Sequence, residues 1–337
     1  MPARRVREIQ NCKDFMRLFN YLNKMLRFLD VQVNKASSLK QEKLEHIATL
    51  NRVALMYMEQ LSVYELNKGI SGIVFSKDRA MQLQALLSSY FFYTKNYAAL
   101  TILYTCSTEE HRKSYAILKD EMKAYPVNFI QEDLFALQLR YLVKNTASDR
   151  IFFMTDDGLF VDHYDLHDSL QFDPVKNIFS LRLGVDMDFC YSYNRPQQIP
   201  AFKEFPQSDN DFKTWKWSAM KDSPDWIYPL SVDATIFLKS EVAIMLEALE
   251  FKNPNSLEYQ MQQYNDLFIC RNGICYDKVK YVNVPCNIVQ TEFDNISTGA
   301  FSTAELLKLF LDGKRIDWRL AEKRPSREVQ TMKYSFI

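Results

Sequence analysis

Short apolar runs alternate with longer amphipathic runs between Gly69 and Asp157, and no other feature of the sequence constrains the fold as strongly. The apolar runs have the length of β-strands and cover residues 70–75, 98–104, 127–130 and 151–154. The runs between them have helical length and cover residues 81–93, 109–125 and 134–144. Such an alternation is typical of a parallel sheet with crossover helices, so it predicts an α/β fold.

Two adjacent carboxylates, Asp156 and Asp157, follow the fourth apolar run and precede Gly158. Open α/β sheets bind ligands at the carboxyl ends of their strands, where these side chains would lie. Neighbouring carboxylates repel each other unless a cation or hydrogen-bond donors compensate them. Mg²⁺ and Mn²⁺ prefer such oxygen ligands and can also bind a diphosphate. Taken alone, a pair of this kind is more often a turn or a helix cap.

Beyond Gly158 the pattern is mixed. Strands are expected over residues 177–183, 189–193 and 230–238, and helices over residues 240–249 and 256–264. The dipeptide Asn272-Gly273 is typical of a two-residue hairpin turn, which would place Cys270 opposite Cys275. Because no export signal opens the chain, we expect these cysteines to be reduced and the protein to be cytoplasmic.

The charge balance excludes a general nucleic-acid binder, because 42 basic residues face 42 acidic ones. The charges are nevertheless unevenly placed. Residues 1–30 and 313–337 each carry seven Lys or Arg against three acids, a net charge of +4 at each end. The sequence between these ends is therefore acidic overall, as a metal-dependent site would tolerate. No run of about 18 uncharged apolar residues is present, so no membrane span is predicted.

The first 68 residues predict a helical extension. Apolar residues recur at helical spacing between Phe15 and Leu29, with basic residues between them, and a second helical run covers residues 38–66. Two interpretations remain open. The extension packs on the main domain or on a second subunit of a homo-oligomer, or its basic amphipathic surface lies against anionic lipid at the inner face of the membrane.

The order of the motifs resembles that of GT-A type glycosyltransferases, in particular the family 2 group and its bacterial members. These enzymes have one αβα sandwich with a mixed sheet, in which the fourth strand ends in an acidic metal motif. The similar segments here are Phe75-Ser-Lys-Asp-Arg79, Thr155-Asp-Asp-Gly158, Ser180-Leu-Arg-Leu-Gly184, Asp225-Trp-Ile-Tyr-Pro-Leu-Ser-Val-Asp233, Asn253-Pro-Asn-Ser-Leu-Glu258 and Val284-Pro-Cys-Asn-Ile-Val-Gln290. The resemblance divides the chain into the extension 1–68, a catalytic domain 69–320 and a basic tail 321–337.

The resemblance implies transfer of a sugar from a nucleotide-sugar donor to a glycan or lipid-linked acceptor. It also implies inversion at the sugar, dependence on Mn²⁺ or Mg²⁺ and a role in polysaccharide biosynthesis. The chain departs from the family pattern at two points. Its acidic motif lacks a third acid, and all four histidines lie before residue 168, so the late metal-binding histidine of many retaining members has no counterpart.

The donor side of the expected site takes its residues from the first and fourth strands. The resemblance assigns Asp157 to the metal, and Asp156 to the metal, a metal-bound water or the ribose. The residues expected to contact the nucleotide sugar are Ser76, Asp78, Arg79, Asp156 and Arg182. For Asp78 a second interpretation stays open, because an Asp at this place could instead cap the following helix.

The acceptor side is expected to provide the base. An inverting transfer needs a carboxylate beside the acceptor hydroxyl, and the resemblance assigns this role to Glu258, with Asp233 as the alternative acid and an acceptor contact. Glu258 could instead close a capping box with Asn255. Trp217 and Trp226 could stack on the acceptor sugar or belong to the core.

Two rival functions stay open at this stage. A degenerate domain of the same fold could serve as a non-catalytic scaffold for interactions. A nucleotidyltransferase could also share the fold, but it would require a glycine-rich loop with Arg or Lys after the first strand, which Ser76-Lys-Asp-Arg79 lacks.

Overall fold

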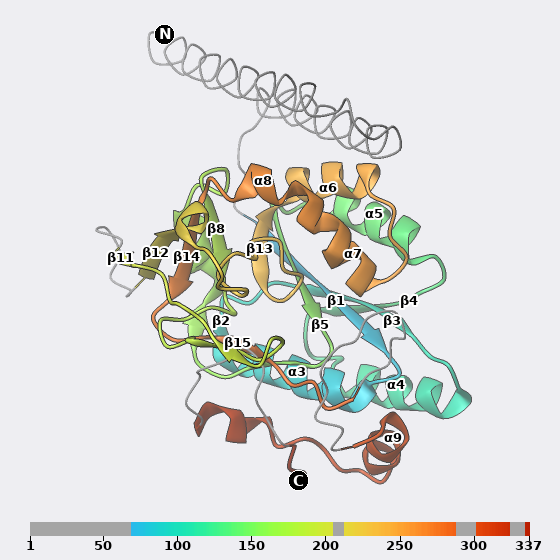
Figure 1. The fold of residues 1–337 in the computed structure, drawn as a ribbon. Coiled ribbons are helices and arrows are strands. Elements are labelled where there is room, and N and C mark those ends of the chain that lie inside the picture. The colour runs from blue at the N-terminus through green and yellow to red at the C-terminus, as the bar shows by residue number, and fades with distance from the viewer. Residues whose placement is uncertain (1–68, 205–211, 288–300, 324–333) are drawn as a thin grey trace, which may run out of the picture. The chain divides into compact units, whose positions relative to one another are not determined.

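A computed structural model describes residues 69–204, 212–287, 301–323 and 334–337. The predicted N-terminal extension, with its lipid and subunit contacts, lies outside the described residues, as do residues 324–333 of the predicted tail. The remaining chain forms a mixed nine-stranded sheet with helices on both faces (Figure 1). The α/β fold class with a mixed sheet that the sequence predicts is therefore confirmed.

The sheet has the strand order β11-β12-β14-β8-β13-β5-β1-β3-β4. Its strands are β1 (Ile70–Lys77), β3 (Leu100–Thr105), β4 (Val127–Gln131), β5 (Arg150–Thr155), β8 (Asn177–Ser180), β11 (Lys203–Glu204), β12 (Phe212–Lys216), β13 (Thr235–Leu238) and β14 (Asn272–Tyr276). Short two-stranded pairs lie outside it and are formed by β2 (Thr94–Lys95), β6 (Gly158–Phe160), β7 (Tyr164–Asp165), β9 (Phe189–Cys190), β10 (Arg195–Pro196) and β15 (Tyr281–Asn283).

Four neighbouring strands, β4, β3, β1 and β5, are parallel. In this half of the sheet Phe75 of β1 lies beside both Thr155 and Leu103. Residues 151–154 are fully buried, as expected for a strand covered by helices on both faces. Because the strands run in one direction and in register, their carboxyl ends and the polar residues that follow meet at one edge.

The other half of the sheet contains antiparallel pairings. β13 is antiparallel to both β5 and β8, and β14 lies between β8 and β12. The predicted hairpin at Asn272-Gly273 is wrong, because both residues belong to β14. A Cβ at Gly273 would come within 2.2 Å of the Trp215 ring, so close packing between strands requires this glycine. The thiols of Cys270 and Cys275 are both free.

Helices cover the two faces of the sheet. α3 (Ala80–Tyr93), α4 (Glu109–Glu121) and α9 (Thr303–Leu311) pack together on one face. α5 (Phe135–Asn145), α6 (Lys239–Ala248), α7 (Pro254–Met261) and α8 (Asn265–Phe268) lie on the other (Figure 1). Short 3₁₀ helices are η2 (Leu166–Gln171), η3 (Trp217–Ala219), η4 (Gln262–Tyr264) and η5 (Trp318–Lys323). The sheet is thus the middle layer of a sandwich, and its core lies on both sides of β1 and β5.

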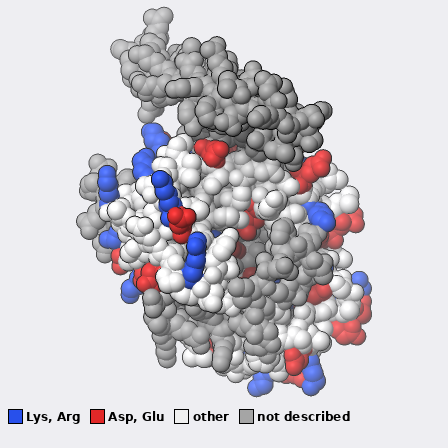
Figure 2. All heavy atoms as spheres, viewed as in Figure 1, with Lys and Arg blue, Asp and Glu red and all other residues white. Residues whose placement is uncertain are grey.

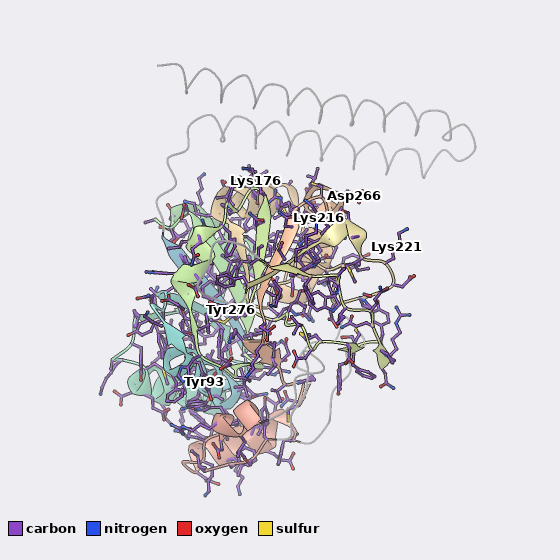
Figure 3. All side chains as sticks on the ribbon, turned by 90° about the vertical axis from the view of Figure 1, so that its left-hand side faces the viewer. Tyr93, Lys176, Lys216, Lys221, Asp266 and Tyr276 are labelled. Carbon is purple, nitrogen blue, oxygen red and sulfur yellow. The ribbon has the colours of Figure 1, made fainter. Side chains whose placement is uncertain are left out.

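Two tyrosines, Tyr276 and Tyr93, connect elements of the domain to the segments that surround them. Tyr276 of β14 donates its hydroxyl hydrogen bond toward the Asp165 carbonyl at 2.9 Å and toward Asp168 at 2.8 Å. Tyr93 ends α3 and is buried against His163 and Trp318. Figure 3 shows the two tyrosines within the body of the domain, whereas Lys176, Lys216 and Lys221 lie toward its surface.

Basic and acidic side chains are interspersed on the face of the molecule shown in Figure 2. Over the residues that the structure describes, no helix combines the length and the apolar character needed to cross a membrane.

At the C-terminal end, Ile316 pairs with Phe336, and the buried Tyr334 donates a hydrogen bond to the Val284 carbonyl at 3.3 Å. These contacts place the last described residues against the sheet edge that carries the acidic pair.

Candidate functional site

A cavity of about 1130 Å³ lies at the carboxyl ends of β1, β3 and β5 and extends to α7. It brings together most of the residues that the sequence predicts for the site. Those that line it are Ser76, Arg79, Asp156, Asp157, Arg182, Asp233 and Glu258. Asp78, Trp217 and Trp226 do not line it.

Asp156 is held by donors from the last two residues of β1 and from Arg79, which follows the strand. Ser76 Oγ donates to its Oδ2 at 2.8 Å, and the Lys77 backbone N–H donates to the same oxygen at 3.1 Å. Arg79 donates to Oδ1 at 3.0 Å. Burial raises the pKa of Asp156, Arg79 opposes this rise, and Asp157 adds to it. These three donors fill most of the acceptor positions of the Asp156 carboxylate. Asp156 therefore anchors the end of β1 and Arg79, and it has little capacity left for a metal ion.

Arg79 lies between the two adjacent acids. Its Nη1 is 3.0 Å from Asp156 and 3.3 Å from Asp157, and its Nη2 donates to the Asn287 carbonyl. Burial opposes the positive charge, but the two carboxylates outweigh this effect and raise the pKa of Arg79. The repulsion that the sequence predicts between the acids is therefore offset in part by a guanidinium of the chain itself.

Replacing Arg79 by Met is expected to destabilise the domain by about 3–5 kcal/mol, because it leaves the buried Asp156 carboxylate without its cation. Arg79→Lys retains the charge and should cost less. The free energy of unfolding in urea measures both effects. Without Arg79 the pKa of Asp156 should rise above its wild-type value of about 6, so the loss should shrink as the pH falls toward 6 and then level off, because the carboxyl is then protonated in both proteins. A loss below about 1 kcal/mol at pH 7.5 would show that the ion pair does not support the fold.

Asp157 faces the cavity more openly than Asp156. The Thr155 hydroxyl lies 2.8 Å from its Oδ1, and 20% of its side chain is exposed. Strand β15 closes this corner, since Asn283 pairs with Gly158 and Val284 N–H donates to the Asp157 carbonyl at 2.8 Å. A Cβ at Gly158 would come within 1.9 Å of the Tyr281 hydroxyl oxygen, so the glycine after the acids serves strand packing.

The oxygen donors in this corner fit a hard divalent cation. Asn283 Oδ1 is buried and has no hydrogen-bond partner among the described residues, and Asn283 lines the same cavity as Asp157. No group of three His, Cys, Asp or Glu side chains that could hold a metal occurs within the described ranges. A magnesium-type ion commonly takes one or two protein ligands and completes its shell with phosphate and water oxygens. Sequence reasoning missed Asn283, because only the pairing of β15 with β6 brings it here.

Glu258 reaches the cavity from α7. Its carboxylate Oε1 accepts a hydrogen bond from Val232 N–H at 3.0 Å. The alternative capping box of Asn255 and Glu258 is wrong, because the helix begins at Pro254 and its cap is Asn253, which accepts from Ser256 N–H at 2.8 Å. Burial raises the pKa of Glu258 to about 7, with a further contribution from the nearby Asp233 charge.

Asp233 lies between the acidic pair and Glu258. The Thr155 hydroxyl is 3.0 Å from Asp233 Oδ1, so this hydroxyl touches both Asp233 and Asp157. Burial raises the pKa of Asp233, Arg182 opposes the rise, and Asp157 adds to it. The strand β13 that follows Asp233 is antiparallel to β5, which explains how a residue 76 positions after Asp157 returns to the same edge.

Arg182, expected at the nucleotide sugar, lies instead among residues on the Glu258 side. It is buried and donates to Ser231 Oγ at 3.0 Å and to Asp225 Oδ1 at 3.3 Å. Burial disfavours its charge, but Asp225, Asp233 and Glu258 together raise the pKa of Arg182. The side chain therefore balances the acids of this wall.

Asp78 ties two loops together. It adopts a left-handed backbone conformation with φ 57°, which Asp tolerates better than most residues. Its carboxylate accepts from Ser107 N–H at 2.7 Å and from Ser107 Oγ at 2.6 Å. The alternative of a helix cap is wrong, since Arg79 occupies the cap position of α3 and no side chain of the described residues caps this helix. Asp78 borders a second cavity of about 560 Å³, next to Lys77 and Ser107, which line both.

Trp217 and Trp226 are fully buried, which favours their alternative role in the core. Trp226 donates its indole N–H to the Met187 carbonyl at 3.0 Å, and its ring packs edge-on against Trp215. Among the described residues, the aromatic side chains that do border the cavity are Phe75, Tyr193 and Tyr228. The sequence offered no spacing or neighbouring motif that would have distinguished these tyrosines from the 17 others.

Comparisons with known proteins relate the chain to glycosyltransferases. It is 28% identical to the bifunctional glycosyltransferase pgtA of Dictyostelium discoideum, with 74% of this chain aligned and 36% of that protein covered. The chain thus spans about a third of the length of this relative. No family model matches the sequence.

Two solved structures align with part of this chain. Residues 1–349 of TarS from S. aureus align with 63% of this chain and 59% of that one, at a TM-score of 0.40 and 15% identity. The bifunctional glycosyltransferase WbbM aligns with 76% of this chain and 51% of its own, at a TM-score of 0.35 and 13% identity.

Proposed function

We propose that the chain is a GT-A type, family 2-like glycosyltransferase that transfers a sugar from a nucleotide-sugar donor to a glycan or lipid-linked acceptor with inversion. The observation that carries the proposal is one cavity lined both by the acidic pair after β5 and by Glu258 of α7. Transfer from a nucleotide sugar needs these two functions, one at the leaving diphosphate and one at the attacking hydroxyl. Sequence relationship to a bifunctional glycosyltransferase supports the class of reaction.

The charge of the cavity supports a requirement for a divalent cation. Among the described residues that line it, seven are acidic and five are basic, a formal charge of −2. A nucleoside diphosphate adds further negative charge, so its binding here needs a positive ion. Asp157 and the Asn283 amide oxygen would hold Mg²⁺ or Mn²⁺, which supplies neutralisation of the leaving diphosphate when it is bound.

At the acceptor end, Glu258 removes the proton of the attacking hydroxyl as the new glycosidic bond forms. A general base works best when its pKa lies near the working pH, and the raised pKa of Glu258, about 7, meets this condition. Its Val232 contact holds one carboxylate oxygen in place. Asp233 contacts the acceptor and lies between the base and the acidic pair.

Binding of a nucleoside diphosphate tests the function without knowledge of the acceptor. We expect UDP or GDP to raise the melting temperature only with Mn²⁺ or Mg²⁺ present, because the cavity is negative without the ion. At 100 times the dissociation constant, the stabilisation should be about 2.7 kcal/mol. Hydrolysis of a panel of nucleotide sugars would then identify the donor.

Two outcomes would contradict the proposal. If no nucleotide stabilises the protein and it hydrolyses no nucleotide sugar, it is a scaffold. Release of inorganic pyrophosphate from a nucleoside triphosphate and a sugar phosphate would instead show nucleotidyl transfer.

A further inference from the structure

A line of buried polar side chains leads from the interior of the domain to Glu258. Gln197 Nε2 donates to Asp225 Oδ2 at 2.9 Å, and Asp225 Oδ1 accepts from Arg182 at 3.3 Å. Arg182 donates in turn to Ser231 Oγ at 3.0 Å. Gln197, Arg182, Asp225 and Ser231 are each at least nine-tenths buried. The line therefore belongs to the fixed framework of the cavity wall.

The Ser231 hydroxyl lies at the end of this line, and both of its acceptor lone pairs are occupied. Besides the Arg182 contact, its Oγ accepts the Asp233 backbone N–H at 3.2 Å. A hydroxyl has two acceptor lone pairs and one proton to donate. The Ser231 hydroxyl also lowers the pKa of Glu258, as a hydrogen-bond donor to that carboxylate would. With both lone pairs occupied, Ser231 can act toward the Glu258 carboxylate only as a donor.

Glu258 consequently faces donors on its protein side. Val232 N–H binds Oε1 at 3.0 Å, and the hydroxyl of the neighbouring Ser231, whose lone pairs are both occupied, has its proton left for this carboxylate. Neither donor can accept a proton from Glu258. The remaining lone pairs of the carboxylate belong to a residue that lines the cavity. A proton taken up by Glu258 must therefore come from the cavity side.

We propose that Arg182 and Ser231 are positioning residues for the base, because Arg182 fixes the Ser231 hydroxyl so that it donates to Glu258 and leaves that carboxylate free to accept a proton only from the cavity. This inference rests on the proposed function, in which Glu258 is the base. It also assigns Arg182 to the acceptor side of the site, away from the nucleotide.

The charged and titratable groups that face Glu258 determine the expected direction of change. Asp233 raises the pKa of Glu258 beyond the effect of burial, and Arg182 lowers it. Tyr228, whose own pKa is raised by burial and by Glu258, borders the same cavity as a neutral hydroxyl. Loss of the Ser231 donor or of the Arg182 charge should therefore make Glu258 harder to ionise.

The pH dependence of kcat/KM measures this effect. In Ser231→Ala we expect the acid limb to move up by about one pH unit, the range expected when one hydrogen bond to a charged group is lost. Ser231→Thr retains a hydroxyl and should return the limb to its wild-type position. The metal-dependent stabilisation by UDP or GDP should not change in Ser231→Ala, because the residue lies on the acceptor side.

A second variant keeps the test decisive if Ser231→Ala does not fold. Arg182→Lys retains the charge but loses the paired donors, so it should move the acid limb in the same direction. The carboxyl ¹³C shift of Glu258, assigned by comparison with Glu258→Gln, reports the same pKa without turnover. An acid limb and a carboxyl titration that stay at the wild-type pH in both variants would overturn the proposal.

The result also separates this proposal from the function on which it rests. Wild-type stabilisation by nucleotide and metal supports the glycosyltransferase function whatever Ser231 does. If Glu258→Gln keeps wild-type turnover, no base exists for Arg182 and Ser231 to position, and the inference is overturned while nucleotide binding stands.

Discussion

Replacing Glu258 by Gln is expected to lower turnover at saturating donor by about 10²–10⁴-fold, the usual contribution of a general base. An amide does not accept a proton at neutral pH, so the acceptor hydroxyl would attack without help. Because the amide oxygen of Gln can still accept the Val232 N–H, the variant should fold normally. Nucleotide binding should also stay close to wild type, since Glu258 faces the acceptor.

A matched control separates the catalytic loss from a general effect of the change. Glu247 lies on α6, is exposed and does not line the cavity, so Glu247→Gln should retain wild-type turnover. A fall smaller than about tenfold in Glu258→Gln would remove Glu258 as the base. The acid to replace next would then be Asp233, which borders the same cavity.

The role of Glu258 as the base determines the direction in which activity should change with pH. A base works only in its ionised form, and burial raises the pKa of Glu258 to about 7. Activity of the wild-type enzyme should therefore be full above this pH and fall as the pH drops through it. The residual activity of Glu258→Gln should lack this acid limb.

Replacing Asp157 by Asn is expected to lower transfer by more than about 100-fold and to remove the metal-dependent part of nucleotide binding. Even residues that only support a metal ligand affect affinity by about 10–100-fold when mutated, so loss of a ligand charge should cost at least as much. The side chain keeps its shape, and an amide nitrogen in place of one carboxylate oxygen can still contact the Thr155 hydroxyl. The fold should therefore remain intact.

A second neutralised carboxylate serves as the control for Asp157. Asp120 is exposed on α4, pairs only with Lys123 among the described ion pairs, and lies away from the cavity. Asp120→Asn should leave both nucleotide binding and transfer unchanged. Full transfer by Asp157→Asn, or by the wild-type protein in excess EDTA, would remove Asp157 and its cation from the mechanism.

The local patterns of the sequence determine the parallel half of the sheet. Each of the four apolar runs from residue 70 to residue 154 is a strand, and each predicted helix between them is present within a few residues. A strand buried on both faces needs a continuous apolar run, and a crossover helix needs periodic apolar residues, so both leave local signatures. The acids after β5 then reach the ligand edge of the sheet because parallel strands end together.

Only the tertiary structure decides how the acids of this edge are compensated and which side chains face the cavity. Arg79, which the resemblance assigns to the nucleotide sugar, fills the space between Asp156 and Asp157. The pairing of β15 with β6 places Asn283 beside Gly158, the residue after Asp157, and β13 returns Asp233 to the same corner. Pairings between strands far apart in sequence depend on packing of the whole core.

The start of α7 shows on a small scale what the sequence determines and what packing decides. The segment from Asn253 to Glu258 predicts a helix start, and the helix is there. Two polar residues, Asn253 and Asn255, could each have capped it, and the sequence pattern alone does not choose between them. The choice of Asn253 frees Glu258 from the cap and lets its carboxylate bind Val232. The sequence thus determined the helix, and the packing of α7 against the turn before β13 decided that its acid faces the cavity.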